Sequence, residues 1–343
     1  MKVGVSVKHD NSFDIIRHIA AIMVIYSHHF ALSGMKEPSF LGVGSFGSCA
    51  VLIFFSISGY LISQSYMRTK SNYGYAKKRF LRVYPGLAVC LIFTIYICGG
   101  FLGKDGFLSW VSSIEAIKTY LRVIFLTGVG VVGVQPEGMN YFTYDYILSN
   151  TMNGSVWTLF FEVFDYIAIA FALSLFKKHN TGVFLLLICS IILQIICIEY
   201  GITKLALRAT SLFTIPFAFG ALLFIYKEKW FYCNRVKFSM LIISMLVMFF
   251  SMGNEILSKT IYPMALCYVT LLVGLSFKDV MIKGRFDFSY GIYIYAFPIQ
   301  QIIINETNIG FFPSMLLSLI LTIIIASISW FFVEKPMLNK KNS

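Results

Sequence analysis

The chain has 343 residues, of which 58% are hydrophobic and only 13% are charged, and its formal net charge is +12. An average soluble domain has about 25% charged residues, so this composition excludes a soluble globular enzyme, a disordered chain and a disulfide scaffold. With a mean hydropathy of +0.77, the chain is predicted to be all-α: a polytopic membrane helix bundle forming a single transmembrane domain over residues 1–343.

Ten apolar runs follow one another along the chain, each bounded by glycine, proline, asparagine or charged residues. They cover residues 13–32, 44–66, 83–101, 156–176, 182–199, 209–226, 237–252, 260–276, 287–305 and 311–333. Because a membrane helix needs about 20 residues, we expect about ten transmembrane helices with short loops.

A long connection lies between the third and fourth runs, and part of it is amphipathic. Residues 106–127 are amphipathic and are expected at the membrane surface; if they cross the membrane, the count becomes eleven and the termini lie on opposite sides. The whole connection, 102–155, is the longest in the chain. It is interpreted either as a lid facing the acceptor or as a structural loop.

Lysine and arginine are distributed as in a membrane protein whose N- and C-termini are both cytoplasmic. In the ten-helix arrangement 20 of the 28 basic residues fall in inner segments and seven in outer segments, as the positive-inside rule predicts. The basic charge therefore needs no nucleic acid partner. The seven cysteines form no CxxC pair, so neither a metal site nor a disulfide framework is expected.

Ionisable residues in the first apolar run form a candidate polar stripe. Asp14 and Arg17 are three residues apart and can pair across one turn. His28, eleven residues after Arg17, returns to nearly the same helix face, roughly 16 Å further along, whereas His29 points about 100° away. A neutral imidazole suits proton transfer near neutral pH. A packed histidine and an arginine reaching the lipid headgroups are the structural alternatives.

Basic residues at the start of the third run provide a candidate phosphate site. Arg79 and Arg82 share one helical face and, with Lys78, could hold a phosphorylated donor; a simple positive-inside anchor is the alternative. In the fourth run, Glu162 lies about two turns into the membrane and is expected to find a polar partner, with His28 or Arg17 the candidates. We hypothesise that Glu162 orients or charges His28.

Other residues near these positions have structural interpretations. Ser155 can cap the fourth helix, and Trp157 can sit at the outer interface. Asp14 and Trp157 are also candidates for substrate binding, and His18 is interpreted as structural.

Six segments occur in the order typical of a known family. They are FDIIRHIAAIMVIYSHH, FFSISGYLI, KRFLRVYP, NGSVWTLFFEVFDY, SYGIYIYAFPIQQ and FFVEKP. Each is weak alone, but the ordered set resembles the acyltransferase 3 family of membrane-bound O-acyltransferases. That resemblance covers nearly the whole chain.

The resemblance implies a ten-helix enzyme of the bacterial inner membrane that moves an acyl group, usually acetyl from cytoplasmic acetyl-CoA, onto a sugar of a surface polysaccharide or a lipid-linked glycan. It makes His28 the catalytic histidine, Arg17 its motif partner, Arg79 and Arg82 donor-binding candidates, and Glu162 the motif glutamate. His28 would either deprotonate the sugar hydroxyl or carry the acyl group itself.

Two departures from the family pattern are visible. Ala296 stands where many relatives have a second histidine before the proline of the ninth helix, so that histidine is not expected to be essential here. The chain ends at Ser343, and no fused periplasmic domain is expected. A transporter or flippase of a lipid-linked sugar is the alternative from another class, because it would also place polar residues in the bundle; an acyltransferase with another acyl group or acceptor is the second alternative.

Overall fold

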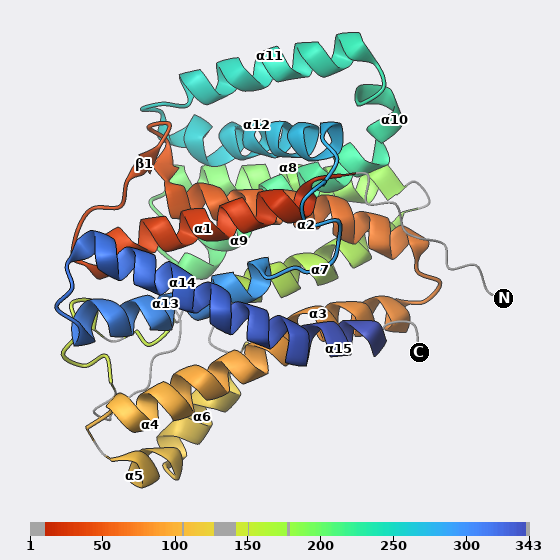
Figure 1. The fold of residues 1–343 in the computed structure, drawn as a ribbon. Helices are drawn as coiled ribbons and strands as arrows, with labels where there is room; N and C mark the ends of the chain where they lie inside the picture. The colour runs from red at the N-terminus through yellow and green to blue at the C-terminus, as the bar shows by residue number, and fades with distance from the viewer. Residues whose placement is uncertain (1–10, 105, 127–141, 150, 177–178, 341–343) are drawn as a thin grey trace.

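The computed structural model describes residues 11–104, 106–126, 142–149, 151–176 and 179–340, and it is a bundle of helices, as predicted (Figure 1). The helices of the first half are α1 (Phe13–Leu32), α2 (Phe46–Arg68), α3 (Asn72–Leu91), α4 (Gly99–Leu102), α5 (Phe107–Val111), α6 (Ile114–Ile124) and α7 (Thr158–Leu175). Those of the second half are α8 (His179–Glu199), α9 (Leu205–Ile225), α10 (Lys227–Trp230), α11 (Asn234–Phe250), α12 (Glu255–Ser276), α13 (Ser289–Glu306), α14 (Phe311–Ser329) and α15 (Lys335–Asn339). Two short strands, β1 (Ser39–Phe40) and β2 (Gly44–Ser45), pair antiparallel between α1 and α2.

Each of the ten apolar runs corresponds to a helix. Within the described residues, eight helical segments are long and apolar enough to cross a membrane; α11 and α13 are not among them. The chain is thus a multi-pass membrane protein. The span count of ten and the cytoplasmic side of the termini stay predictions, although α1 begins and α15 ends at the same end of the bundle (Figure 1).

Helix α13 is central, which accounts for its lower hydropathy. Every residue from Ser289 to Gln301 is buried, and α13 packs against α1, α3 and α14. Since its neighbours cover it, it can hold tyrosine and glutamine side chains that would be costly against lipid. Ala296 is fully buried and packs with Ala21 and Ile25 of α1. Apolar packing therefore fills the position where many relatives have a second histidine.

The segment after α3 does not add a membrane span among the described residues. Helix α3 continues through a π-helical stretch, Ile92–Cys98, into α4, and α5 and α6 fold back beside them (Figure 1). Helix α6 has 11 residues and is only about 16 Å long, whereas the hydrocarbon core is about 30 Å thick. The eleven-span alternative is therefore not supported. Residues 127–141 and 150, a large part of the predicted lid, lie outside the described residues.

Candidate active site

Two neighbouring cavities contain most of the residues that the sequence singled out. The first, here called the arginine cavity, has a volume of about 310 Å³ and is lined by three guanidinium groups, two carboxylates and several hydroxyls. Its ionisable lining consists of Arg17, Arg79, Arg82, Glu162, Asp287 and the tyrosines Tyr166, Tyr290 and Tyr293. Three cationic groups against two carboxylates give this cavity an excess of positive charge.

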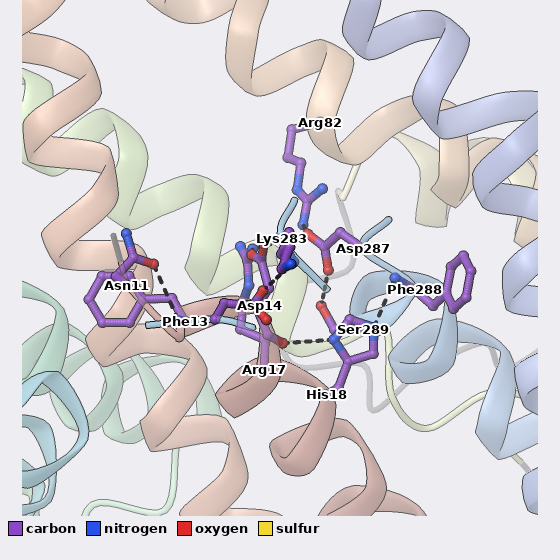
Figure 2. Close-up of polar contacts among 11 residues, drawn as sticks. Asn11, Phe13, Asp14, Arg17, His18, Arg82, Lys283, Asp287, Phe288 and Ser289 are labelled. Carbon is purple, nitrogen blue, oxygen red and sulfur yellow. Dashed lines mark hydrogen bonds and ion pairs between the residues drawn. The ribbon is translucent and has the colours of Figure 1, made fainter. Parts of the chain in front are cut away.

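Asp287 joins two of the three arginines. Arg82 of α3 donates to its Oδ2 at 2.6 Å, and Arg17 of α1 lies 3.1 Å from the same oxygen (Figure 2). Ser289 donates to Oδ1 at 2.5 Å. Burial opposes the ionisation of Asp287, but the two guanidinium groups and these hydrogen bonds outweigh it and hold its pKa far below the usual range. The carboxylate thus fixes Arg17 and Arg82 on one wall of the cavity.

Residues of the first helix help to position Asp287. The ion pair predicted between Asp14 and Arg17 is present, although Asp14 is not among the residues that line the cavity. His18 Nδ1 lies 2.7 Å from the Asp14 carbonyl oxygen, and its Nε2 accepts a hydrogen bond from the Phe288 backbone at 3.1 Å (Figure 2). Both contacts are satisfied by a neutral Nδ1–H imidazole, which agrees with the structural interpretation of His18.

The other two basic candidates behave differently from each other. Arg79 lines the arginine cavity, donates to Ser65 at 3.2 Å and lies 5.8 Å from the ring centroids of Tyr75 and Tyr166. Lys78 instead donates to Thr69 at 3.0 Å, at the end of α2, and is not among the lining residues. The structure brings Arg79 together with Arg17 and Arg82, and leaves Lys78 apart from them.

Glu162 lies in the arginine cavity, and its hydrogen bonds differ from those expected. It accepts hydrogen bonds from Tyr166, one turn away, and from Ser58 of α2 at 3.4 Å. The prediction that it would pair with His28 or Arg17 is therefore wrong. The spacing of four residues between Glu162 and Tyr166 could have revealed the first partner. The contact with Ser58 depends on how α2 packs against α7, which the sequence does not show.

His28 belongs to the second cavity, here called the histidine cavity, with a volume of about 410 Å³. Its polar and aromatic lining includes His28, Glu37, Ser45, Ser48, Cys49, Trp157, Ser258, Lys259, Tyr262 and Tyr293. The imidazole meets the Phe297 ring edge to face, with centroids 5.4 Å apart, and its Nδ1 is buried without a hydrogen-bond partner among the described residues. His29 differs: it is fully buried and bonds Ser314 at 3.0 Å and Gln300 at 3.2 Å.

The continuous stripe from Arg17 to His28 is replaced by two adjoining cavities. Arg17 lines one and His28 the other, while Val51 and Tyr293 line both and form the boundary between them. The Tyr293 hydroxyl is hydrogen-bonded to Thr158 at 2.6 Å. One helix face does carry both groups, but neighbouring side chains divide the space in front of it.

The segment before α7 shapes this boundary. Trp157 lines the histidine cavity, so it faces the interior, which fits its candidacy as a substrate contact. Ser155 does not cap α7, which has no side-chain cap, and its hydroxyl is buried without a partner among the described residues. A side chain at Gly154 would overlap Phe297, the ring that packs on His28. A glycine is therefore required here for the position of the imidazole.

Two acidic residues of these cavities were missed from the sequence. Glu37 is in the loop after α1 and Asp287 is in the loop before α13. Glu37 lies outside the membrane runs and Asp287 is the first residue of the run 287–305, so the cost of burying a charge in lipid did not mark either of them. Among the described residues no group of three His, Cys, Asp or Glu side chains could hold a metal ion.

Comparison with known proteins identifies the family. A family model described as an acyltransferase domain matches residues 10–334. The chain belongs to the acyltransferase 3 family. This acyltransferase is 34% identical over 340 residues to an O-acetyl transferase of Shigella phage Sf6, covering 97% of both chains. It is also 25% identical over 363 residues to nodulation protein 10 of Rhizobium leguminosarum bv. viciae, covering 98% of this chain and 95% of that one. No solved structure matches. Membership confirms the resemblance in the six segments and disfavours a flippase.

Proposed function

We propose that this acyltransferase resides in a bacterial inner membrane and transfers the acetyl group of cytoplasmic acetyl-CoA to a hydroxyl group of a surface polysaccharide unit. The name of the phage relative supports the acetyl group. The observation that carries the proposal is the adjacency of a cavity rich in guanidinium groups to a cavity that holds His28. One can bind a phosphorylated donor and the other can bind the acceptor.

The donor is assigned to the arginine cavity because guanidinium groups bind phosphate through paired hydrogen bonds. Arg79 is the best placed of the three, since its neighbours are a serine hydroxyl and two tyrosine rings, whereas Arg17 and Arg82 share Asp287. At about 310 Å³ the cavity is at the lower limit for a drug-sized ligand. It would therefore hold part of acetyl-CoA, with the thioester directed towards Tyr293 and the histidine cavity.

The chemistry assigned to His28 is general base catalysis. Its imidazole takes the proton of the acceptor hydroxyl while the oxygen attacks the thioester carbonyl carbon. The carbon–oxygen bond forms, the carbon–sulfur bond breaks, and the imidazolium returns the proton to the departing thiolate. The products are the acetyl ester and free CoA. Trp157, in the same cavity, offers an aromatic face to the sugar ring.

The test uses the purified protein in lipid nanodiscs with radiolabelled acetyl-CoA and lipid-linked glycan from the bacterium that produces the protein. We expect label in the glycan with wild type and at least a 100-fold lower rate with His28→Ala, at equal expression and thermal stability. Arg79→Ala should raise the KM for acetyl-CoA. Lys78→Ala is the matched control and should leave both the transfer rate and this KM unchanged. Transfer from succinyl-CoA but not acetyl-CoA would refute the acetyl assignment, and isolation of an acetylated protein whose label His28→Ala abolishes would replace direct transfer with a covalent route.

A further inference from the structure

Glu37 is the carboxylate that shares a cavity with His28. It lies in the loop between α1 and β1 and lines the histidine cavity together with the imidazole. Glu162, the carboxylate that the sequence suggested for this role, lines the arginine cavity and bonds Tyr166 and Ser58. The acid available to His28 therefore comes from a loop and not from the motif helix α7.

Two helices, α1 and α2, hold Glu37 in place. Ser27, which precedes His28 on α1, donates a hydrogen bond from its hydroxyl group to Glu37 Oε2 at 2.6 Å. Gly47, in the first turn of α2, leaves the necessary room: a Cβ there would lie 3.1 Å from Ser27 Oγ and 3.8 Å from Glu37 Oε2. The carboxylate is thus anchored through one oxygen beside the residue that precedes the histidine.

We infer that Glu37 is the positioning residue of the proton-transfer step, stabilising the imidazolium that forms when His28 takes the proton of the acceptor hydroxyl. The inference rests on the proposed function, because it needs His28 to act as the base. Its physical basis is that an ion pair in a partly enclosed cavity is stronger than in water. Glu37 keeps its hydrogen bond to Ser27 throughout, so the proton that moves is the one that His28 takes and returns.

Other charged and titratable groups face the same space. Among the lining residues these are Cys49 of α2, Lys259 and Tyr262 of α12, and Tyr293 of α13. Lys259 pairs with Glu255 at the start of α12, and Cys49 and Tyr262 are hydrogen-bonded to each other at 3.4 Å. Of the lining residues that the structure describes, Glu37 is the one with a carboxyl group.

The experiment measures acetyl transfer in nanodiscs as a function of pH for wild type, Glu37→Gln, Glu37→Asp and Ser27→Ala. Glu37→Gln should lower kcat about 10–100-fold, leave the KM for acetyl-CoA within twofold, and move the midpoint of the rise of kcat with pH about one unit lower, because the imidazolium loses its counterion. Glu37→Asp should recover part of kcat and of the midpoint. Ser27→Ala should cause a smaller loss. Glu199→Gln, an exposed glutamate at the end of α8, is the matched control and should behave as wild type.

The outcomes separate this inference from the function on which it rests. If wild type transfers no acetyl group from acetyl-CoA, the proposed function fails. If wild type is active and Glu37→Gln keeps the wild-type midpoint, whether or not kcat falls, Glu37 has only a structural role and the inference is overturned. If Glu162→Gln moves the midpoint and Glu37→Gln does not, Glu162 of α7 is the positioning residue and the inference is overturned.

Discussion

At the scale of single residues, Asp287 connects segments that are distant in the sequence. Its carboxylate holds Arg17 of α1 and Arg82 of α3, and all three side chains are at most 20% exposed. Removing one member of a buried ion pair leaves the other charges uncompensated. The stability of the bundle and the form of the arginine cavity therefore depend on the same side chain.

We predict that Asp287→Asn lowers the free energy of unfolding by about 3–5 kcal/mol at pH 7. The pKa of Asp287 is depressed in the folded protein, so its contribution is present above the unfolded-state pKa of about 3.9 and is lost as the pH falls below that value. The stability difference between wild type and variant should thus be constant from about pH 5 to pH 9. Thermal unfolding in detergent across this range measures it.

A matched control is provided by an exposed ion pair. Lys104 and Asp145 are paired at 52% and 61% exposure, and exposed pairs contribute about 0–1 kcal/mol. Asp145→Asn should therefore leave the unfolding temperature nearly unchanged. Equal losses in the two variants, or a difference for Asp287→Asn that disappears between pH 6 and pH 8, would contradict the role given to Asp287.

The residue scale is also where sequence reasoning was least complete. Membrane insertion cost identified Arg17, His28 and Glu162, and all three line cavities. Helical spacing along α1 placed Arg17 and His28 on one face. It could not show that Tyr293, from α13, divides the space between them. Glu37 lies between two apolar runs and Asp287 is the first residue of another, positions where a charge costs little, so only the folded arrangement shows that they are functional candidates.

At the scale of elements, apolar run length predicted the helices well. The first run was expected at residues 13–32 and α1 covers Phe13–Leu32. The largest difference is α3, which starts at Asn72, eleven residues before the expected run, since Ser71 caps it and accepts a hydrogen bond from the Gly74 backbone. Hydropathy cannot detect a helix whose first turns are basic, although capping can.

Close contact between α2 and α9 depends on glycine. A Cβ at Gly59 would overlap the Phe217 carbonyl oxygen, and one at Gly220 would approach that of Ser56. Small residues allow membrane helices to approach closely. We predict that Gly59→Ala forces the two helices apart and lowers the free energy of unfolding by about 1–3 kcal/mol, measured as a lower unfolding temperature in detergent.

The effect should depend on position and not on the added size. Ala76 is exposed on α3, so Ala76→Leu should leave the unfolding temperature unchanged. Because α2 contributes Val51 and Ser58 to the cavity walls, Gly59→Ala should also reduce transfer activity. An unchanged unfolding temperature in Gly59→Ala would mean that the α2–α9 contact does not limit stability.

At the scale of the whole molecule, the two cavities lie towards opposite ends of the bundle. Arg17 and Asp287 lie near the starts of α1 and α13, whereas Glu37 and Ser45 come from the β1–β2 region at the other end (Figure 1). The predicted cytoplasmic loops are those at the arginine end. This polarity suits a donor from one side of the membrane and an acceptor from the other.

Native cysteines allow this polarity to be tested. Cys233 is exposed and directly precedes α11, in a loop predicted to be cytoplasmic. Helix α11 begins at the same end of the bundle as α1 (Figure 1). The other exposed cysteine of the seven, Cys189, lies in the middle of α8, where the surrounding lipid keeps a membrane-impermeant reagent away from it. A membrane-impermeant maleimide should therefore label Cys233 in inside-out vesicles and not in intact spheroplasts.

The reverse pattern is expected for a cysteine at the opposite end. Lys204 is exposed before α9, in a predicted outer loop, so Lys204→Cys in a Cys233→Ser background should react in spheroplasts and be protected in inside-out vesicles. Labelling of Cys233 in intact spheroplasts would show that the bundle has the opposite orientation in the membrane. The arginine cavity would then face away from cytoplasmic acetyl-CoA, and the donor would have to enter beside His28 instead of beside Arg79.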